Sequence, residues 1–293
     1  MYTYYKLLND VEELSRAGIK TGVVGRSGLG RPIPYARFGS RGGRRVIVTA
    51  GIHAREHVSS LLVSRQMSAL AAAADRFAAA LKSGGIYFVP MLNPDGNLLV
   101  YGGADTVPDA LKKPLIALNG GSDDFSLWKA DCAGVDLNTN FDARWGTGAQ
   151  NVFAPAPANY VGTAPFDRPE TRILRDFTLK VDPAATISYH ALGREIYWRF
   201  GQSGAALERD RRIAEFVNAV LRYDLIDGGD GFSSAGGYKD WCVSVLKIPS
   251  LTIELVPKNY SHPLLDDACI ADDFVRNEFL PVRLLQYLIT TDI

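Results

Sequence analysis

The chain has 293 residues, and its 32 Lys and Arg balance 32 Asp and Glu, so the formal net charge is zero. This balance disfavours a general nucleic-acid-binding protein, which needs a basic surface. The three cysteines, Cys132, Cys242 and Cys269, are too few for a disulfide scaffold and lack the CxxC spacing of a structural zinc site. A hydrophobic content of 47% is typical of a globular protein, and only four histidines are present.

Neither a membrane span nor a signal peptide is predicted. No stretch reaches about 18 consecutive apolar residues, and the first ten residues lack a basic segment followed by an apolar core. We therefore expect no membrane insertion and a cytoplasmic protein. Secretion stays open if the sequence was trimmed at its beginning.

The hydrophobic pattern predicts strands that alternate with helices. Strands are predicted at 21–24, 33–38, 45–50, 85–90, 186–190, 195–200 and 250–255, the first three as a meander and 186–190 paired with 195–200. Helices are predicted at 4–17, from 58 to the low seventies with a second piece to 81, and at 169–177, 205–221 and 272–288. Residues 93–96 are predicted as a turn, and 101–129 and 138–163 as loops. This alternation indicates one α/β domain over residues 1–293, with helices on both faces of a buried sheet.

Four polar residues follow or end the predicted buried strands. His53 and Glu56 come directly after the strand at 45–50, His190 ends a second strand, and Glu254 nearly ends a third. Because ligands bind beyond the carboxyl ends of the strands in open α/β sheets, these side chains can meet at one point. Two histidines and a glutamate form a catalytic zinc set with one position open, and a further carboxylate can act as general base.

Each of these signals is weak when taken alone. A His-x-x-Glu pair occurs often by chance, and a histidine at a strand end is more often a core residue. Glu254 is harder to dismiss, since a carboxylate between apolar strand residues needs a partner. The set as a whole is much more specific than any member.

The residues resemble those of the zinc carboxypeptidase family, the carboxypeptidase A-like peptidases. Five landmarks occur in the family's order: Gly51-Ile-His-Ala-Arg-Glu56, Asn93-Pro-Asp-Gly96, Gly134-Val-Asp-Leu-Asn-Thr-Asn-Phe141, Tyr189-His190 and Thr252-Ile-Glu-Leu255. The resemblance implies a single α/β domain whose central, mixed, mostly parallel and twisted sheet has about eight strands. It also implies one zinc ion per chain.

The resemblance further implies a role for each site residue. His53, Glu56 and His190 would bind the zinc, and Glu254 would be the general base. Arg55 would help bind the substrate and polarise its carbonyl, and Lys129 would stabilise the oxyanion. Asp136 is a candidate hydrogen-bond acceptor for one of the zinc-binding histidines.

Within the family, three stretches resemble bacterial γ-D-glutamyl-diamino acid peptidases, which act on peptidoglycan stem peptides. These stretches are residues 127–130, 188–198 and 236–241. The resemblance therefore implies a peptide substrate of the cell-wall type. Lys239 aligns with the base of the family's specificity pocket, where a lysine would favour the extra carboxylate of diaminopimelate.

The chain departs from the family pattern at two positions. Thr139 stands where the family has an arginine that clamps the substrate's terminal carboxylate, although Asn138 is retained. Phe232 stands where many members have a tyrosine. We hypothesise that some of four cations, Lys239, Arg144, Arg194 and Arg199, recognise the carboxylate instead, against the alternative that the arginines are solvated surface charges.

Three alternatives remain open. His53-Ala-Arg-Glu-His57 also spells H-x-x-E-H, in which both histidines bind zinc, but no glutamate lies between Glu56 and Glu170 as a third ligand. The simpler expectation is that His57 lies beside the site without binding metal and that His262 lies on the surface. The chain could also be a carboxypeptidase for ordinary peptides, or a catalytically weak zinc protein that only binds muropeptides.

Overall fold

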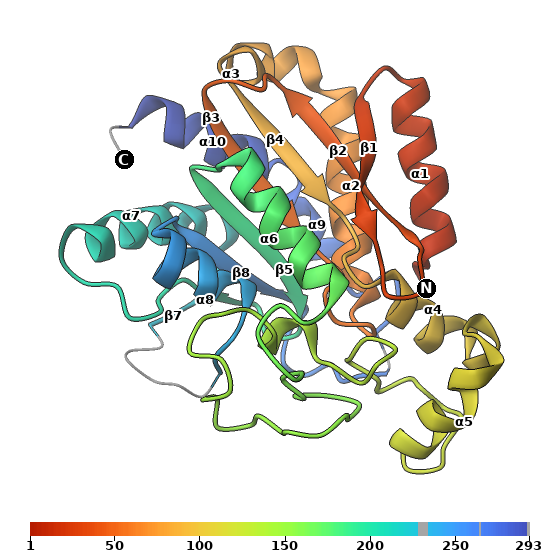
Figure 1. Ribbon diagram of the computed structural model, residues 1–293. Helices are drawn as coiled ribbons and strands as arrows, with labels where there is room; N and C mark the ends of the chain where they lie inside the picture. The colour runs from red at the N-terminus through yellow and green to blue at the C-terminus, as the bar shows by residue number, and fades with distance from the viewer. Residues whose placement is uncertain (228–233, 264, 292–293) are drawn as a thin grey trace.

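One eight-stranded sheet organises the computed structural model, which describes residues 1–227, 234–263 and 265–291 (Figure 1). The strands lie in the order β1-β2-β4-β3-β5-β8-β6-β7. Their bounds are β1 Lys20–Arg26, β2 Pro32–Gly39, β3 Arg44–Thr49, β4 Gly84–Val89, β5 Ala185–Ala191, β6 Glu195–Tyr197, β7 Asp224–Ile226 and β8 Ser250–Leu255. The four central strands, β4, β3, β5 and β8, are parallel to one another. The pairs β1·β2, β2·β4 and β6·β8 are antiparallel.

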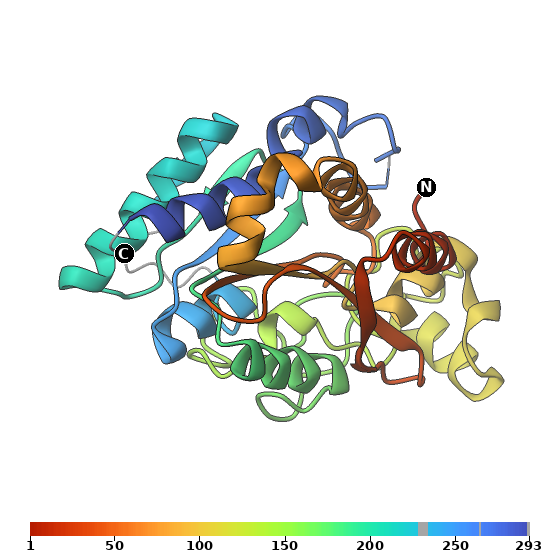
Figure 2. The same cartoon turned by 90° about the horizontal axis from the view of Figure 1, so that it is seen from above.

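Helices cover both faces of the sheet. Figure 2 shows α6 and α8 on one side, and α1, α2, α3, α7 and α10 on the other. The helices are α1 Tyr4–Arg16, α2 His57–Ala72, α3 Ala78–Ser83, α4 Pro94–Gly102, α5 Asp109–Leu118, α6 Pro169–Val181, α7 Gly204–Leu221, α8 Tyr238–Trp241, α9 Ala271–Asn277 and α10 Leu280–Thr290. Short 3₁₀ turns, η1 to η3, lie at Ala74–Phe77, Ala104–Thr106 and Leu137–Thr139, and a π turn, η4, lies at Cys242–Leu246.

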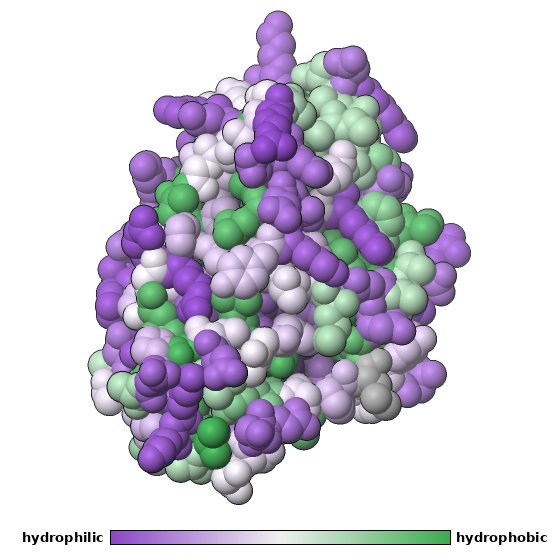
Figure 3. All heavy atoms as spheres, turned by 90° about the vertical axis from the view of Figure 1, so that its right-hand side faces the viewer, coloured by the Kyte–Doolittle hydropathy of each residue, from purple (hydrophilic) through white to green (hydrophobic). Residues whose placement is uncertain are grey.

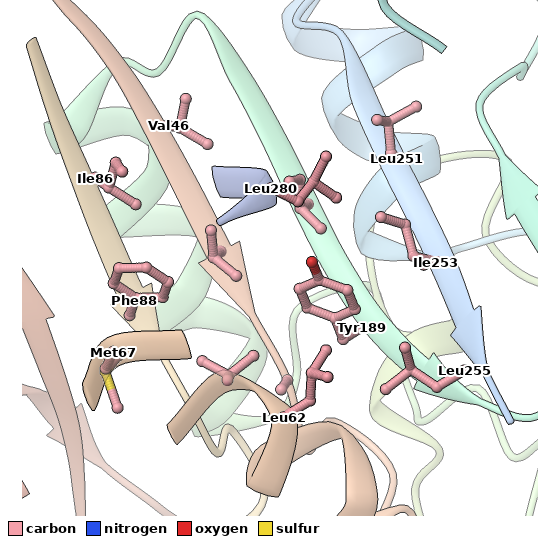
Figure 4. Close-up of a cluster of buried hydrophobic side chains, with 14 of the residues drawn as sticks. Val46, Leu62, Met67, Ile86, Phe88, Tyr189, Leu251, Ile253, Leu255 and Leu280 are labelled. Carbon is pink, nitrogen blue, oxygen red and sulfur yellow. The ribbon is translucent and has the colours of Figure 1, made fainter. Parts of the chain in front are cut away.

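The larger part of the core lies between the sheet and the layer that contains α2 and α10. Successive strand residues point to opposite faces, and Tyr189, Ile253 and Leu255 point into this core (Figure 4). Leu62 and Met67 of α2 belong to the same core and enter it from the helix side. Every residue of β5 is buried because helices cover the strand on both faces.

The predicted α/β fold is confirmed, as is the mixed, mostly parallel sheet of eight strands with helices on both faces. The predicted meander is wrong. β4 lies between β2 and β3, because the crossover through α2 and α3 returns the chain parallel to β3. The predicted pairing of 186–190 with 195–200 is also wrong, since β8 lies between β5 and β6.

Helices replace parts of three other predictions. The expected turn at 93–96 is the beginning of α4, where Asn93 caps the helix and Pro94 takes its first position, since turns and helix starts use the same residue types. The expected loop at 101–129 contains α5, which the internal Pro114 hides from a pattern search. The single helix at 272–288 is two helices, and Pro281 lies at the beginning of the second.

Hydrophilic and apolar side chains are interspersed on the face that carries α1 and α5 (Figure 3). The large exposed apolar residues are scattered along the chain, from Met1 to Val275. In the ranges that the structure describes, every helix is too short or too polar to cross a bilayer.

Hydrogen bonds of the Asn93 side chain link α4 to two loops at the carboxyl edge of the sheet. Its side-chain oxygen accepts from the Gly96 amide at 2.9 Å, and its amide group donates to the carbonyls of Ile52 and Ala130 at 3.3 and 3.1 Å. The residue is fully buried. The loops that contain Ile52 and Ala130 also carry His53 and Lys129, so this one side chain links the fold to the edge where the polar residues gather.

We expect Asn93→Ala to lower the free energy of unfolding by about 2–4 kcal/mol, because it removes a helix cap and leaves two buried carbonyls without a donor. Asn119→Ala is the matched control. Asn119 also donates to two carbonyls, of Ser122 and Asp124, but in an exposed loop, so the expected loss is under about 1 kcal/mol. Chemical denaturation followed by circular dichroism measures both, and equal losses would contradict the linking role of Asn93.

Candidate metal centre and substrate cavity

A tight turn after β3 places His53 and Glu56 at the carboxyl edge of the sheet. Gly51 has a φ of +59°, and a Cβ atom there would lie 2.4 Å from the Ser60 hydroxyl. Glycine is therefore required at this position. The chain then turns away from the sheet, and Glu56 immediately precedes α2.

The register of β5 and β8 brings the other two residues together. His190 is the direct partner of Glu254, and Ser188 is the partner of Thr252. Because Tyr189 and Ile253 point into the core, their neighbours His190 and Glu254 point to the opposite face of the sheet. Both side chains therefore lie on the same face of the sheet, at the carboxyl edge where the turn after β3 places His53.

His53, Glu56 and His190 form a buried cluster that fits a metal ion. Their ligand atoms lie within 4.8 Å of one another, and each residue is at most 5% exposed. His53 Nδ1 lies 2.8 Å from Glu56 Oε1, and His190 Nδ1 lies 3.3 Å from Glu56 Oε2. The two Nδ1 atoms are 3.1 Å apart, close to the roughly 3.4 Å between two nitrogens on one tetrahedral zinc.

The second nitrogen of each histidine lies near a polar oxygen. His53 Nε2 lies 3.2 Å from Asp136 Oδ1, and His190 Nε2 lies 3.2 Å from the Ser188 hydroxyl. With protons on both Nε2 atoms, the Nδ1 lone pairs point at each other. A cation between them removes that repulsion, which makes the donor set suitable for zinc.

Asp136 is a fully buried carboxylate that is held in its charged form. Its Oδ2 lies 3.1 Å from Lys129 Nζ, and its oxygens accept from the amides of Asn138 and Asn159. Burial opposes ionisation, but Lys129 and His53 together hold the pKa of Asp136 well below its usual range. Asp136 therefore lies close to the His53 ring and fixes the Lys129 ammonium group.

A cavity of about 280 Å³ opens beside the group formed by His53, Glu56 and His190. Its walls include His53, His190, Glu254, Lys129, Asn138 and Lys239. Glu254 is half-buried, and burial is the largest of the causes that raise its pKa to about 7. Such a carboxyl group can both take up and release a proton near neutral pH.

Lys239 supplies positive charge to the far side of the cavity. Its Nζ lies 2.6 Å from Asp240 Oδ1 and donates to the Arg199 carbonyl at 3.0 Å. The ammonium group also lies over the Phe200 ring, 5.3 Å from its centroid. Since an ammonium group has three donors, one remains for a ligand in the cavity.

Other predicted site residues do not line this cavity. Arg55 donates to the Leu127 carbonyl at 2.9 Å, and Arg144 is exposed. Arg194 forms a two-pronged salt bridge with the buried Asp273, at 2.9 and 3.3 Å. Phe232 lies outside the residues that the structure describes.

The remaining histidines have other partners. His57 Nδ1 lies 2.7 Å from the Tyr101 hydroxyl, and its Nε2 lies 3.2 Å from Asp267. Both ring nitrogens are thus engaged away from the metal cluster. His262, predicted on the surface, is half-buried, with Nε2 3.3 Å from the Ala191 carbonyl.

Sequence reasoning missed several residues of the site. Ser188 precedes His190 by two positions, so strand periodicity alone places it on the same face. Gln150, Tyr197 and Asp240 also line the cavity. Gln150 lies in an irregular loop and carries no pattern that could have identified it.

Comparisons with known proteins agree with this geometry. A family model described as zinc carboxypeptidase matches residues 4–272. The γ-D-glutamyl-L-diamino acid endopeptidase 1 of Lysinibacillus sphaericus is 34% identical over 265 residues, which cover 87% of this chain and 65% of that protein. An uncharacterised protein of Bacillus subtilis is 29% identical, over 79% of this chain and 63% of its own length. The chain therefore spans less than two thirds of either relative.

Solved structures share the fold at low sequence identity. Bovine thrombin-activatable fibrinolysis inhibitor has a TM-score of 0.77 at 19% identity, covering 98% of this chain and 97% of its own. The murein-tripeptide amidase of Escherichia coli O157 has a TM-score of 0.55 at 21% identity, with 91% of both chains covered.

We expect the purified protein to hold about one zinc per chain, and His190→Ala to hold much less, because zinc keeps its affinity only with its full set of ligands. His57→Ala is the control and should keep the wild-type zinc content. Elemental analysis after dialysis measures the metal, and circular dichroism checks folding. Zinc lost in folded His57→Ala, or kept in His190→Ala, would contradict this assignment.

Proposed function

Because the chain belongs to the zinc carboxypeptidase family, we propose that it is a zinc-dependent peptidase that hydrolyses an amide bond in a peptidoglycan stem peptide. The observation that carries the proposal is one cavity whose walls include Glu254, two lysines and both histidines of the His-Glu-His group. A zinc ion held by His53, Glu56 and His190 would activate a water molecule and polarise the scissile carbonyl.

Glu254 is the proposed general base. Its side chain lies beside His190 on the neighbouring strand and faces the cavity, within reach of a water molecule next to the cluster. In its ionised form it takes the proton from the attacking water. It then passes this proton to the departing amine.

Lys129 is the proposed stabiliser of the negative charge that develops on the carbonyl oxygen. Its ammonium group lines the cavity and is held by Asp136 at 3.1 Å. Because that position is fixed before substrate arrives, little reorganisation is needed as the charge develops. Arg55 stays a second candidate for this role, from the family resemblance.

The relative from Lysinibacillus sphaericus supports a substrate with a γ-D-glutamyl-diamino acid bond. Lys239 suits it, since diaminopimelate has a second carboxylate that an ammonium group can bind. Asn138 is the other proposed substrate contact, and its side-chain oxygen already accepts from the Tyr238 amide at 3.1 Å. The cytoplasmic location and the lack of nucleic-acid binding stay predictions from the sequence.

One observation argues against an ordinary carboxypeptidase. The Thr139 hydroxyl donates to the carbonyls of Asp136 and Tyr160, at 2.9 and 3.2 Å, so it is not directed at a substrate carboxylate. Mass analysis of products from purified muropeptides and from simple peptides, with and without a chelator, separates the two activities. Release of single C-terminal residues from ordinary peptides would favour the carboxypeptidase.

We expect Glu254→Gln to lower kcat by about 10²–10⁴-fold, because the amide cannot accept the water's proton, while the zinc content stays near wild type. Glu195→Gln is a matched control. Glu195 of β6 is the register partner of Glu254 in β8, but its carboxylate is bound to Lys258 and Tyr197. It should change kcat less than tenfold. A Glu254→Gln variant with full zinc and near-normal turnover would contradict the general-base role, and an inactive wild type would favour a protein that only binds muropeptides.

We expect Lys239→Ala to raise KM for a γ-D-Glu-diaminopimelate substrate by about 10–100-fold, the loss of one charged hydrogen bond. The same peptide with lysine in place of diaminopimelate lacks the extra carboxylate, so its KM should change little. An equal change for both peptides would show that Lys239 does not read this carboxylate. Lys113→Ala, on the exposed side of α5, controls for the loss of a surface charge.

A further inference from the structure

A second and larger cavity, of about 450 Å³, lies between the sheet and α6. Its walls come from the first four strands of the sheet and from α6. It is separate from the metal cluster. Arg45 lines the cavity and precedes the end of β3 by four residues, which is roughly 13 Å of extended chain. His53 lies beyond that end of the strand, so the two sites are at opposite ends of β3. The volume is within the range of small-molecule sites, roughly 300–1,000 Å³.

Positive charge gathers around this cavity, although the whole chain is neutral. Four cations line it, Arg37, Arg41, Arg45 and Lys180, against one carboxylate, Asp176. The carboxylate is already paired with Arg175 at 2.8 Å, and Arg45 is paired with Asp182 at 3.2 Å. Within the described ranges, Arg41 and Lys180 have no ion-pair partner, so an excess of positive charge remains.

The inner wall of the cavity is aromatic. Phe177 of α6 lies between Tyr35 and Tyr87, with ring centroids 5.5 and 5.9 Å apart. Tyr87 is buried, whereas Tyr35 and Phe177 are only half-buried. The Tyr35 ring packs against the β1 backbone at Gly22, where a Cβ atom would lie 2.7 Å from the ring. The glycine thus lets this wall form close to the strand.

We propose that this cavity binds a planar organic anion, such as an aromatic phosphate or carboxylate. The flat apolar body lies against Tyr35 and Phe177, and the anionic group reaches Arg41 and Lys180. Guanidinium groups bind phosphate and carboxylate oxygens in pairs and also stack on flat rings, so the two halves of the site suit the two halves of one ligand. The site is distinct from the substrate cavity and does not depend on the proposed function.

The test is a fluorescence titration with 1-anilinonaphthalene-8-sulfonate, an organic anion that carries a flat naphthalene ring. We expect saturable binding to the wild type and at least tenfold weaker binding to the double variant Arg41→Glu and Lys180→Glu. The matched control is Lys113→Glu with Arg212→Glu, which makes the same charge change on α5 and α7 and should bind within twofold of wild type. Zinc content and peptide hydrolysis should be unchanged in both.

A second variant and a competing ligand test the apolar half of the proposed binding site. Val23 lines the cavity and is 55% exposed, so Val23→Asp should weaken binding without disturbing the core. Phenyl phosphate should displace the probe at concentrations where inorganic phosphate does not. No saturable binding to the wild type, equal losses in the two double variants, an unaffected Val23→Asp, or equal displacement by inorganic phosphate would each overturn the proposal.

Discussion

The parallel pairing of β5 with β8 is the constraint on which the site depends. It sets His190 directly beside Glu254 and turns both away from the core, because Tyr189, Ile253 and Leu255 occupy the alternate positions. A shift of one residue would exchange polar and apolar side chains on both faces. The large buried area on the apolar face therefore fixes in place His190, a candidate metal ligand, and Glu254, the proposed general base. The same strand register serves both the stability of the core and the geometry of the site.

The other half of the site is held by polar contacts between loops. His53 comes from the turn after β3, and Asp136 comes from a loop far along the chain, yet the two are 3.2 Å apart. Asp136 also holds Lys129, and Asn93 donates to the loops on either side. Buried polar groups of this kind are costly unless all are satisfied. The contacts between them favour one arrangement of these irregular segments.

Charge is distributed unevenly in a protein that is neutral overall. In the cavity beside the His-Glu-His group, Lys129 and Lys239 are each paired with a carboxylate, and Glu254 also lines the walls. The cavity under α6 instead has four cations against one carboxylate. Elsewhere arginines are neutralised in pairs, as Arg194 is by Asp273. Net charge therefore says little about binding here, since local excess charge attracts an anionic ligand.

The sequence alone determined most of the helices and strands, the family and the His53, Glu56, His190 and Glu254 set, because these depend on local periodicity and on short motifs at strand ends. Only the tertiary structure decided the strand order, in which β4 and β8 are inserted between strands that are neighbours in the chain. It also decided where the predicted cations lie, since Lys239 lines the cavity whereas Arg194 is paired with Asp273. Strand order and charge pairing arise from contacts between distant residues, which no local pattern encodes.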